Sequence, residues 1–180
     1  MNKPEFKNRG NSEHKLADGR TLWESRSPAV VGIILAIVKD NIYVLTEKRS
    51  AMMDEPNKWA VVSGYMDWDE TGIEAIIRET YEETSFHIPK WKNRLVFDND
   101  EQPFYVHTDP KTDAKQNVSL SYIFIYEMDK LPMEVEQFQD KEIDAVKWME
   151  ISEVFKESQW AFNHDERIEM AVEKYQNYLI

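Results

Sequence analysis

Two runs of mostly apolar residues, many of them β-branched, stand out along the chain at positions 29–38 and 42–46. The polar tripeptide Lys39-Asp40-Asn41 separates them. Two short apolar runs joined by a polar turn are typical of a β-hairpin whose strands are buried. The pattern therefore predicts a hairpin made of these two runs.

The period of the apolar residues changes over positions 71–85. On a helix, one face of this segment would carry Ile73, Ile76, Ile77, Thr80 and Thr84, which fall within an arc of about 100°. We therefore expect a helix here that packs this face on a sheet.

The remaining pattern adds short strands and two helices. Further strands are predicted at 59–62, 94–97, 104–106, 118–127 and 145–149, with a polar loop at 108–116. A short helix is predicted from Ser152 to Lys156, and a C-terminal helix over 165–179, where apolar residues recur every three or four positions. Residues 1–27 are mostly polar and are expected to be an irregular lead-in with one short strand near Thr21.

Strands interspersed with a few helices predict an α/β fold, with helices on both faces of a mixed β-sheet. The chain has 180 residues, 42% of them hydrophobic and 31% charged, and no biased tract. This size and composition are those of one folded domain, so a single domain over residues 1–180 is expected.

Charge and cysteine content narrow the functional classes. A net charge of -12 would repel a nucleic acid backbone, so extended nucleic acid is not an expected partner. The sequence has no cysteine, which excludes thiolate nucleophiles and Cys-ligated zinc. No membrane-length apolar run and no secretory signal pattern are present, so we expect a cytoplasmic protein without a membrane partner.

Three carboxylates converge on the predicted helix. At about 100° per residue, Glu79, Glu82 and Glu83 share one arc beside the apolar face, and Arg78 alone cannot neutralise them. Hard divalent ions such as Mg²⁺ prefer carboxylate oxygens, so a bound cation would explain the cluster. The alternative is a solvated acidic helix face.

The segment from Gly64 to Phe86 resembles the Nudix box, the signature of the Nudix hydrolase superfamily. The residues that match at the required spacings are Gly64, Glu70, Arg78, Glu79, Glu82, Glu83 and Phe86. Thr80 replaces an apolar residue, and Ser85 replaces the glycine that ends the helix, but neither change removes a presumed ligand. The weaker resemblance extends over roughly residues 29–155 and implies a Nudix-type α/β/α sandwich.

The resemblance implies roles for the residues of the box. Glu79 and Glu83 would bind Mg²⁺, with Mn²⁺ as an alternative, and Glu82 would be a further ligand or a water-activating base. Arg78 would orient these carboxylates. Gly64 would bring the backbone close to the metal, with the Ser63 carbonyl as a further ligand, while Glu70 would brace the loop or favour the helix dipole.

Residues outside the box supply further candidates. A downstream acid often acts as base or ligand in the family, and the acids in that region are Glu136, Asp140 and Glu142, of which Glu142 is preferred. Arg49 and Lys48 are candidate phosphate contacts. Aromatic faces suit a nucleobase, although core packing is the more common role, and the residues to test are Tyr65, Trp68 and Trp160.

The resulting hypothesis is a metal-dependent pyrophosphohydrolase that cleaves a diphosphate linkage in a nucleoside diphosphate joined to another moiety. Pro103 is only loosely placed for an ADP-ribose preference. One alternative is a Nudix-fold sensor module that binds a nucleotide without turnover, which the complete carboxylate set argues against. Isopentenyl diphosphate isomerase is disfavoured because that relative uses a catalytic cysteine. Family members often form homodimers, so a homodimer is also considered.

Overall fold

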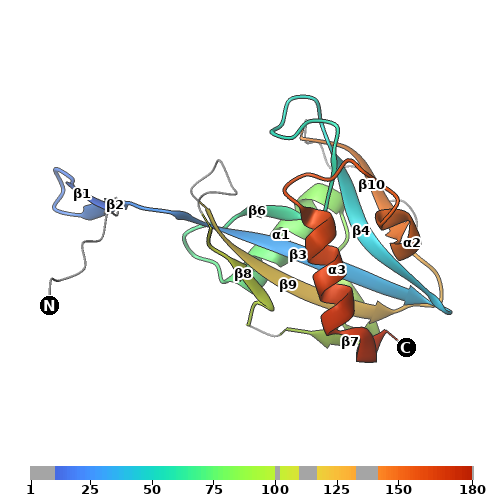
Figure 1. The fold of residues 1–180 in the computed structure, drawn as a ribbon. Coiled ribbons are helices and arrows are strands. Elements are labelled where there is room, and N and C mark those ends of the chain that lie inside the picture. The colour runs from blue at the N-terminus through green and yellow to red at the C-terminus, as the bar shows by residue number, and fades with distance from the viewer. Residues whose placement is uncertain (1–10, 100–101, 110–116, 133–141, 180) are drawn as a thin grey trace, which may run out of the picture.

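A mixed β-sheet forms the centre of the molecule, and helices lie on both of its faces (Figure 1). The computed structural model describes residues 11–99, 102–109, 117–132 and 142–179. The sheet follows the order β10-β4-β3-β9-β7, with β5 beside β4, β6 beside β3 and β8 beside β9. The bounds of these strands are β3 Ser27–Val38, β4 Asn41–Arg49, β5 Trp59–Ala60, β6 Ser63–Tyr65, β7 Leu95–Asp98, β8 Tyr105–His107, β9 Asn117–Glu127 and β10 Ile143–Glu150.

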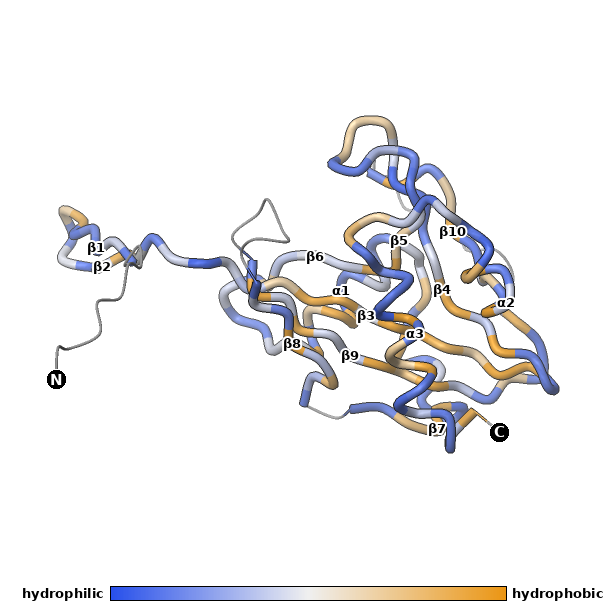
Figure 2. The backbone as a smooth tube through the Cα atoms, viewed as in Figure 1, coloured by the Kyte–Doolittle hydropathy of each residue, from blue (hydrophilic) through white to orange (hydrophobic). Residues whose placement is uncertain are grey.

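The predicted hairpin is confirmed. Strands β3 and β4 pair antiparallel, with Leu35 opposite Val44 and Val38 opposite Asn41. On its other side β3 pairs in parallel with β9 from Ser27–Asn117 to Ile37–Glu127. Figure 2 shows that apolar residues concentrate on these central strands while the loops are polar. The two central strands therefore form the apolar centre of the sheet.

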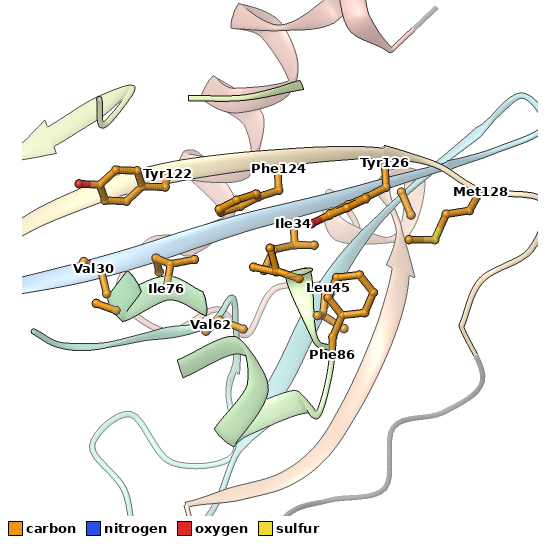
Figure 3. Packing of buried hydrophobic residues seen from close by; sticks show 13 residues of the cluster. Val30, Ile34, Leu45, Val62, Ile76, Phe86, Tyr122, Phe124, Tyr126 and Met128 are labelled. Atoms are coloured by element: carbon orange, nitrogen blue, oxygen red, sulfur yellow. The ribbon is translucent and has the colours of Figure 1, made fainter. Parts of the chain in front are cut away.

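Alternate residues of the central strands face opposite sides of the sheet. Val30, Ile34 and Ala36 of β3 pack in a core with helix α1 (Gly72–Thr84), and Figure 3 shows Ile76 and Phe86 beneath the strands there. Val31, Ile33 and Leu35 pack in a second core with Ile168 and Ala171 of helix α3 (His164–Lys174). The sheet is thus covered on both faces, which confirms the predicted α/β fold.

Local capping fixes where α1 begins and ends. Thr71 is the N-cap, and its hydroxyl accepts from the Glu74 amide while the Glu74 carboxylate accepts from the Thr71 amide. This reciprocal pair satisfies two donors of the first turn. At the other end Ser85 adopts a left-handed conformation (φ 57°), and its amide donates to the Tyr81 carbonyl at 2.8 Å. Ser85 therefore terminates the helix where a glycine was expected.

Several boundaries differ from the sequence predictions. The lead-in contains a hairpin, β1 (Ser12–Lys15) with β2 (Thr21–Glu24), which projects away from the body (Figure 1). The C-terminal helix ends at Lys174, before a 3₁₀ turn (Gln176–Tyr178). Helix α2 covers Ile151–Val154 without a side-chain cap, because the Ser152 hydroxyl donates to Glu150 instead. A 3₁₀ helix, Ile88–Arg94, was not predicted.

No helix in the described part of the chain is long and apolar enough to cross a membrane.

Candidate active site

A cavity of about 1150 Å³ opens beside the N-terminal half of β3 and the acidic face of α1. On one side it is lined by Ser63, Gly64, Arg78, Glu79 and Glu83. The opposite wall comes from β4, β8, β9 and the segment before and within α3, and includes Arg49, Tyr105, Ser119, Trp160, Phe162, His164 and Arg167. The acidic residues of the helix therefore face a space large enough for a small ligand.

Gly64 brings the backbone of β6 against the acidic helix. It pairs with Val30 of β3, and a Cβ atom at this position would overlap the Glu79 carboxylate. Next to it, the Ser63 amide donates to the Glu83 carboxylate at 3.3 Å. Glycine is required here because any side chain would displace Glu79.

Arg78 connects the acids around the cavity rim. Its guanidinium donates to both Glu70 oxygens, at 2.6 and 3.0 Å, and to the Tyr65 carbonyl at 3.1 Å. Nη1 lies 2.9 Å from Glu79 and 3.0 Å from Glu82. The hydrogen bonds to Glu70, followed by those to Glu79 and Glu82, raise the pKa of Arg78 above its usual value. Arg78 is thus a permanent cation that holds three carboxylates in place.

Glu70 braces the loop before α1. Its carboxylate also accepts from the Asp67 amide at 2.7 Å, so it links that loop to Arg78. The hydrogen bond from Arg78 lowers the pKa of Glu70, and the Asp67 amide acts in the same direction. Glu70 therefore stays ionised and serves the loop rather than the cavity.

The carboxylates nearest the cavity are held in an environment that disfavours their charge. Burial is the main reason why the pKa of Glu79 is raised. Burial also raises the pKa of Glu83 well above its usual value, and the neighbouring Glu47 carboxylate adds to the effect. A group with a desolvated negative charge is stabilised by an adjacent cation. These two acids are therefore suited to bind one.

Glu47 is a residue that sequence reasoning missed. It lies on β4, is completely buried, and has a pKa raised to about 7, mainly by burial. Glu83 is within hydrogen-bonding reach of it, and the charges of Glu79 and Glu142 also act on it. The available signal was an acidic residue directly after the apolar run 42–46, where the strand was expected to be buried. Burying a carboxylate is costly unless it has a function or a partner.

Cations and aromatic rings share the opposite wall. The Arg49 guanidinium lies 4.9 Å from the Phe162 ring centre, and that of Arg167 lies 5.3 Å from the ring centre of Tyr105. Buried His164 accepts from the Val61 amide, and its pKa is lowered to about 3, first by burial and then by the charges of Arg167 and Arg49. His164 is therefore neutral, and the positive charge beside it comes from Arg49 and Arg167, while Lys58 also lines the cavity.

The other predicted site residues divide into two groups. Tyr65, Trp160, Arg49 and Glu142 line the cavity together with Ser63. Lys48, Trp68 and Glu82 do not. Alternation along β4 places Lys48 on the opposite face from Glu47 and Arg49, Trp68 is 93% exposed on its loop, and Glu82 is 55% exposed beside Arg78. Glu136 and Asp140 lie outside the described residues.

The donor set fits a hard divalent cation. Glu79 and Glu83 offer carboxylate oxygens to the cavity, Gly64 leaves room for close backbone approach, and Glu47 adds a buried acid behind Glu83. Within the described ranges, no three acidic or histidine side chains already converge on one point. A bound cation would have to draw these carboxylates together, and Glu82 would first have to leave Arg78.

Comparison with known proteins places the chain in a family. The NUDIX domain model matches residues 26–170, which cover the whole central sheet, α1 and most of α3. The chain belongs to the Nudix family. Together with the Nudix structures to which it is similar, this match shows that the chain has the Nudix fold. No curated protein matches the chain.

Solved Nudix structures share the fold at low identity. The NUDIX domain of Shewanella oneidensis NrtR, complexed with ADP ribose, is 20% identical with a TM-score of 0.66, over 83% of this chain and 88% of that one. A mutT/nudix family protein from Listeria innocua is 21% identical with a TM-score of 0.64, over 85% and 96%. A bifunctional NMN adenylyltransferase/ADP ribose pyrophosphatase from Francisella tularensis is 22% identical with a TM-score of 0.60, over 83% of this chain but only 41% of that one.

Proposed function

We propose that this Nudix chain is a metal-dependent pyrophosphohydrolase that cleaves the diphosphate linkage of a nucleoside diphosphate joined to another moiety. The observation that carries the proposal is that desolvated Glu79 and Glu83 lie beside Gly64 of strand β6 at the wall of a large cavity. Carboxylates in that setting suit metal binding better than exposed surface acids do.

The residues that would hold Mg²⁺ or Mn²⁺ are Glu79 and Glu83, with Glu82 and the Ser63 carbonyl as further ligands. A structure of a similar bifunctional enzyme from Francisella tularensis is described as complexed with AMP and a Mn ion, which supports the choice of metal. When bound, the metal would lower the pKa of a water molecule and offset the charge of the phosphate oxygens.

The protein's own groups would supply orientation and proton transfer. Arg78 fixes the position of Glu79 through the 2.9 Å ion pair and keeps the Tyr65 backbone close. Glu142 lines the cavity, and its charge acts on Glu47, so it is the candidate outside α1 to accept a proton from an attacking water. Arg49 and Arg167 would attract the phosphates from the opposite wall, since a guanidinium matches phosphate geometry.

The aromatic residues of that wall suit the nucleoside. Tyr105, Trp160 and Phe162 line the cavity and could stack on a base. ADP-ribose is the first substrate to test, because the names of two similar proteins include it. Dinucleotides, nucleotide sugars and modified nucleoside triphosphates follow as the comparison set.

The test is a hydrolysis screen with purified protein in Mg²⁺ or Mn²⁺, in which released nucleoside monophosphates, or free diphosphate from the triphosphates, are detected. We expect turnover of at least one nucleoside diphosphate compound, its loss with a chelator, and its recovery when metal is restored. The variant Glu79→Gln should lose most of this turnover while keeping its circular dichroism spectrum. Tight ADP-ribose binding without turnover of any compound would instead identify a sensor module, as the similarity to NrtR allows.

A further inference from the structure

Glu47 lies behind the acidic face of helix α1, and its side chain is more deeply buried than those of Glu79 and Glu83. Strand alternation puts it on the same face of β4 as Leu45, which belongs to the core beneath α1. Its side chain is completely buried. In the sheet, Glu47 lies opposite Ala60 of β5 on one side and Val146 of β10 on the other. Apolar neighbours therefore surround an acid that has no access to solvent.

Among the described residues, neither carboxylate oxygen of Glu47 has a hydrogen-bond donor. The group within reach is the Glu83 carboxylate, which also lacks a proton to donate when it is ionised. Arg49 exerts some attraction, but its Nε donates to the Asp54 carbonyl at 2.7 Å and its guanidinium lies over Phe162. A proton shared with Glu83 is thus the one donor within reach of Glu47 among the described residues, and when both acids are ionised they face each other without a donor.

Buried charges are rare unless they are paired or coordinate a metal. Glu83 lines the cavity and is within hydrogen-bonding reach of Glu47, so an ion that binds Glu83 from the cavity would lie next to Glu47. A divalent cation would satisfy both carboxylates at once, because each can offer one or two oxygens. The same ion would relieve the repulsion that Glu79 and Glu142 exert on Glu47.

We propose that Glu47 is an additional metal ligand, which with Glu83 holds a divalent cation at the buried end of the cavity. The inference rests on the proposed function only in its choice of metal. The ligands from the box would then be joined by one from strand β4 of the central sheet, so the cation would connect helix α1 to the sheet.

The primary test is Mn²⁺ binding, measured by calorimetry and by electron paramagnetic resonance, on the wild-type chain and on Glu47→Gln. Glutamine keeps the shape of the side chain and removes its charge. We expect Mn²⁺ affinity to fall at least about tenfold, or one bound ion to be lost, while circular dichroism and the melting temperature of the metal-free chain are retained or raised. Glu127→Gln, the same change at the exposed end of β9, should bind Mn²⁺ like the wild type.

A second measurement does not depend on how the variant folds. In a Mn²⁺-soaked crystal of the wild-type protein, an oxygen of Glu47 should lie roughly 2.1 Å from the ion, as for other small hard cations. Unchanged Mn²⁺ affinity and stoichiometry in a folded Glu47→Gln variant, or an ion bound without Glu47, would overturn the inference and identify a pair of acids that share a proton. That result would not contradict hydrolysis by the wild type. Conversely, failure of the substrate screen would contradict the proposed function but not Mn²⁺ binding by Glu47.

Discussion

The two walls of the cavity have opposite electrostatic character. The wall built from α1 and β6 carries desolvated acids, Glu79 and Glu83, whose negative charge is poorly stabilised without a cation. The wall built around α3 carries Arg49 and Arg167, each lying over an aromatic ring. A ligand between them meets a site for positive ions on one side and a site for anions on the other. We infer that the first wall controls the chemical step and the second controls affinity.

Removing an acid from the first wall should have the largest effect. In Glu83→Gln, loss of a metal ligand should lower kcat by roughly 10³-fold at saturating Mg²⁺, since a bound metal contributes several kcal/mol to charge stabilisation. Steady-state hydrolysis assays measure this change. Glu169→Gln, an exposed site on α3, is the matched control and should keep the wild-type rate. Equal rates for the two variants would remove the chemical role of the acidic wall.

Glu47, which lies behind the acidic wall, should make the metal-free chain less stable as pH rises. The folded-state pKa of Glu47 is about 7, above its usual 4.5, so between these values the folded chain holds more protons than the unfolded chain. The free energy of unfolding should therefore fall across this interval, by up to roughly 3 kcal/mol from Glu47 alone, and the raised pKa of Glu83 should extend the fall to higher pH. Glu70 has a lowered pKa, so its ionised carboxylate stabilises the fold throughout this interval. That stabilisation is lost only at lower pH, where the carboxylate becomes protonated.

Urea denaturation in a chelator, at a series of pH values, measures this slope. Saturating Mg²⁺ should reverse most of the loss, because the cation stabilises the ionised acids. Stability that rises between pH 4.5 and pH 7 without metal would contradict the described environment of Glu47.

Much of the acidic wall could be predicted from the sequence, since its residues follow one another within a single loop and helix. Gly64, Arg78 and Glu79 have fixed spacings, and helical geometry alone brings the carboxylates to one face. The fold was predictable for a similar reason, because the apolar run that forms β3 is a local feature of the sequence. Glu82 is the exception, because Arg78 holds it outward toward solvent.

The opposite wall could not be predicted in this way. Tyr105 and Arg167 are far apart in sequence, and only the packing of α3 against the sheet brings them together. Glu47 could have been noticed as an acid next to an apolar run, but Lys48 and Arg49 follow it, so the three residues look like a charged end of the strand. The exposure of Trp68 and the position of Lys48 depend on loop and strand geometry that composition does not determine.

A change on the arginine-bearing wall should affect binding more than turnover. Arg167→Met removes the cation beside Tyr105 and should raise KM roughly tenfold, with a smaller change in kcat. The reason is that a partly desolvated guanidinium that contacts phosphate contributes to substrate binding. Lys174→Met is the matched control, since Lys174 also lies over an aromatic ring, 5.7 Å from the centre of Tyr175, but outside the cavity. A fall in kcat with constant KM would assign Arg167 to the chemical step.

The smallest effect is expected at Trp68. Because its side chain is 93% exposed and does not line the cavity, Trp68→Ala should change KM by less than about twofold. Tyr65→Ala, close to it in sequence but at the cavity wall, should raise KM more. Titration of substrate with each variant separates the two outcomes, and a larger effect at Trp68 would mean that its loop closes over the ligand.

The parallel pairing of β3 with β9 also constrains the order of folding. Ser27 pairs with Asn117, so a strand made early in synthesis must wait for a partner made much later. Contacts between such distant segments form slowly, because a long loop must close before they contribute any stability. During translation, the hairpin and α1 would therefore exist with one edge of β3 open, and the cavity would acquire its second wall only after β9 and α3 had left the ribosome.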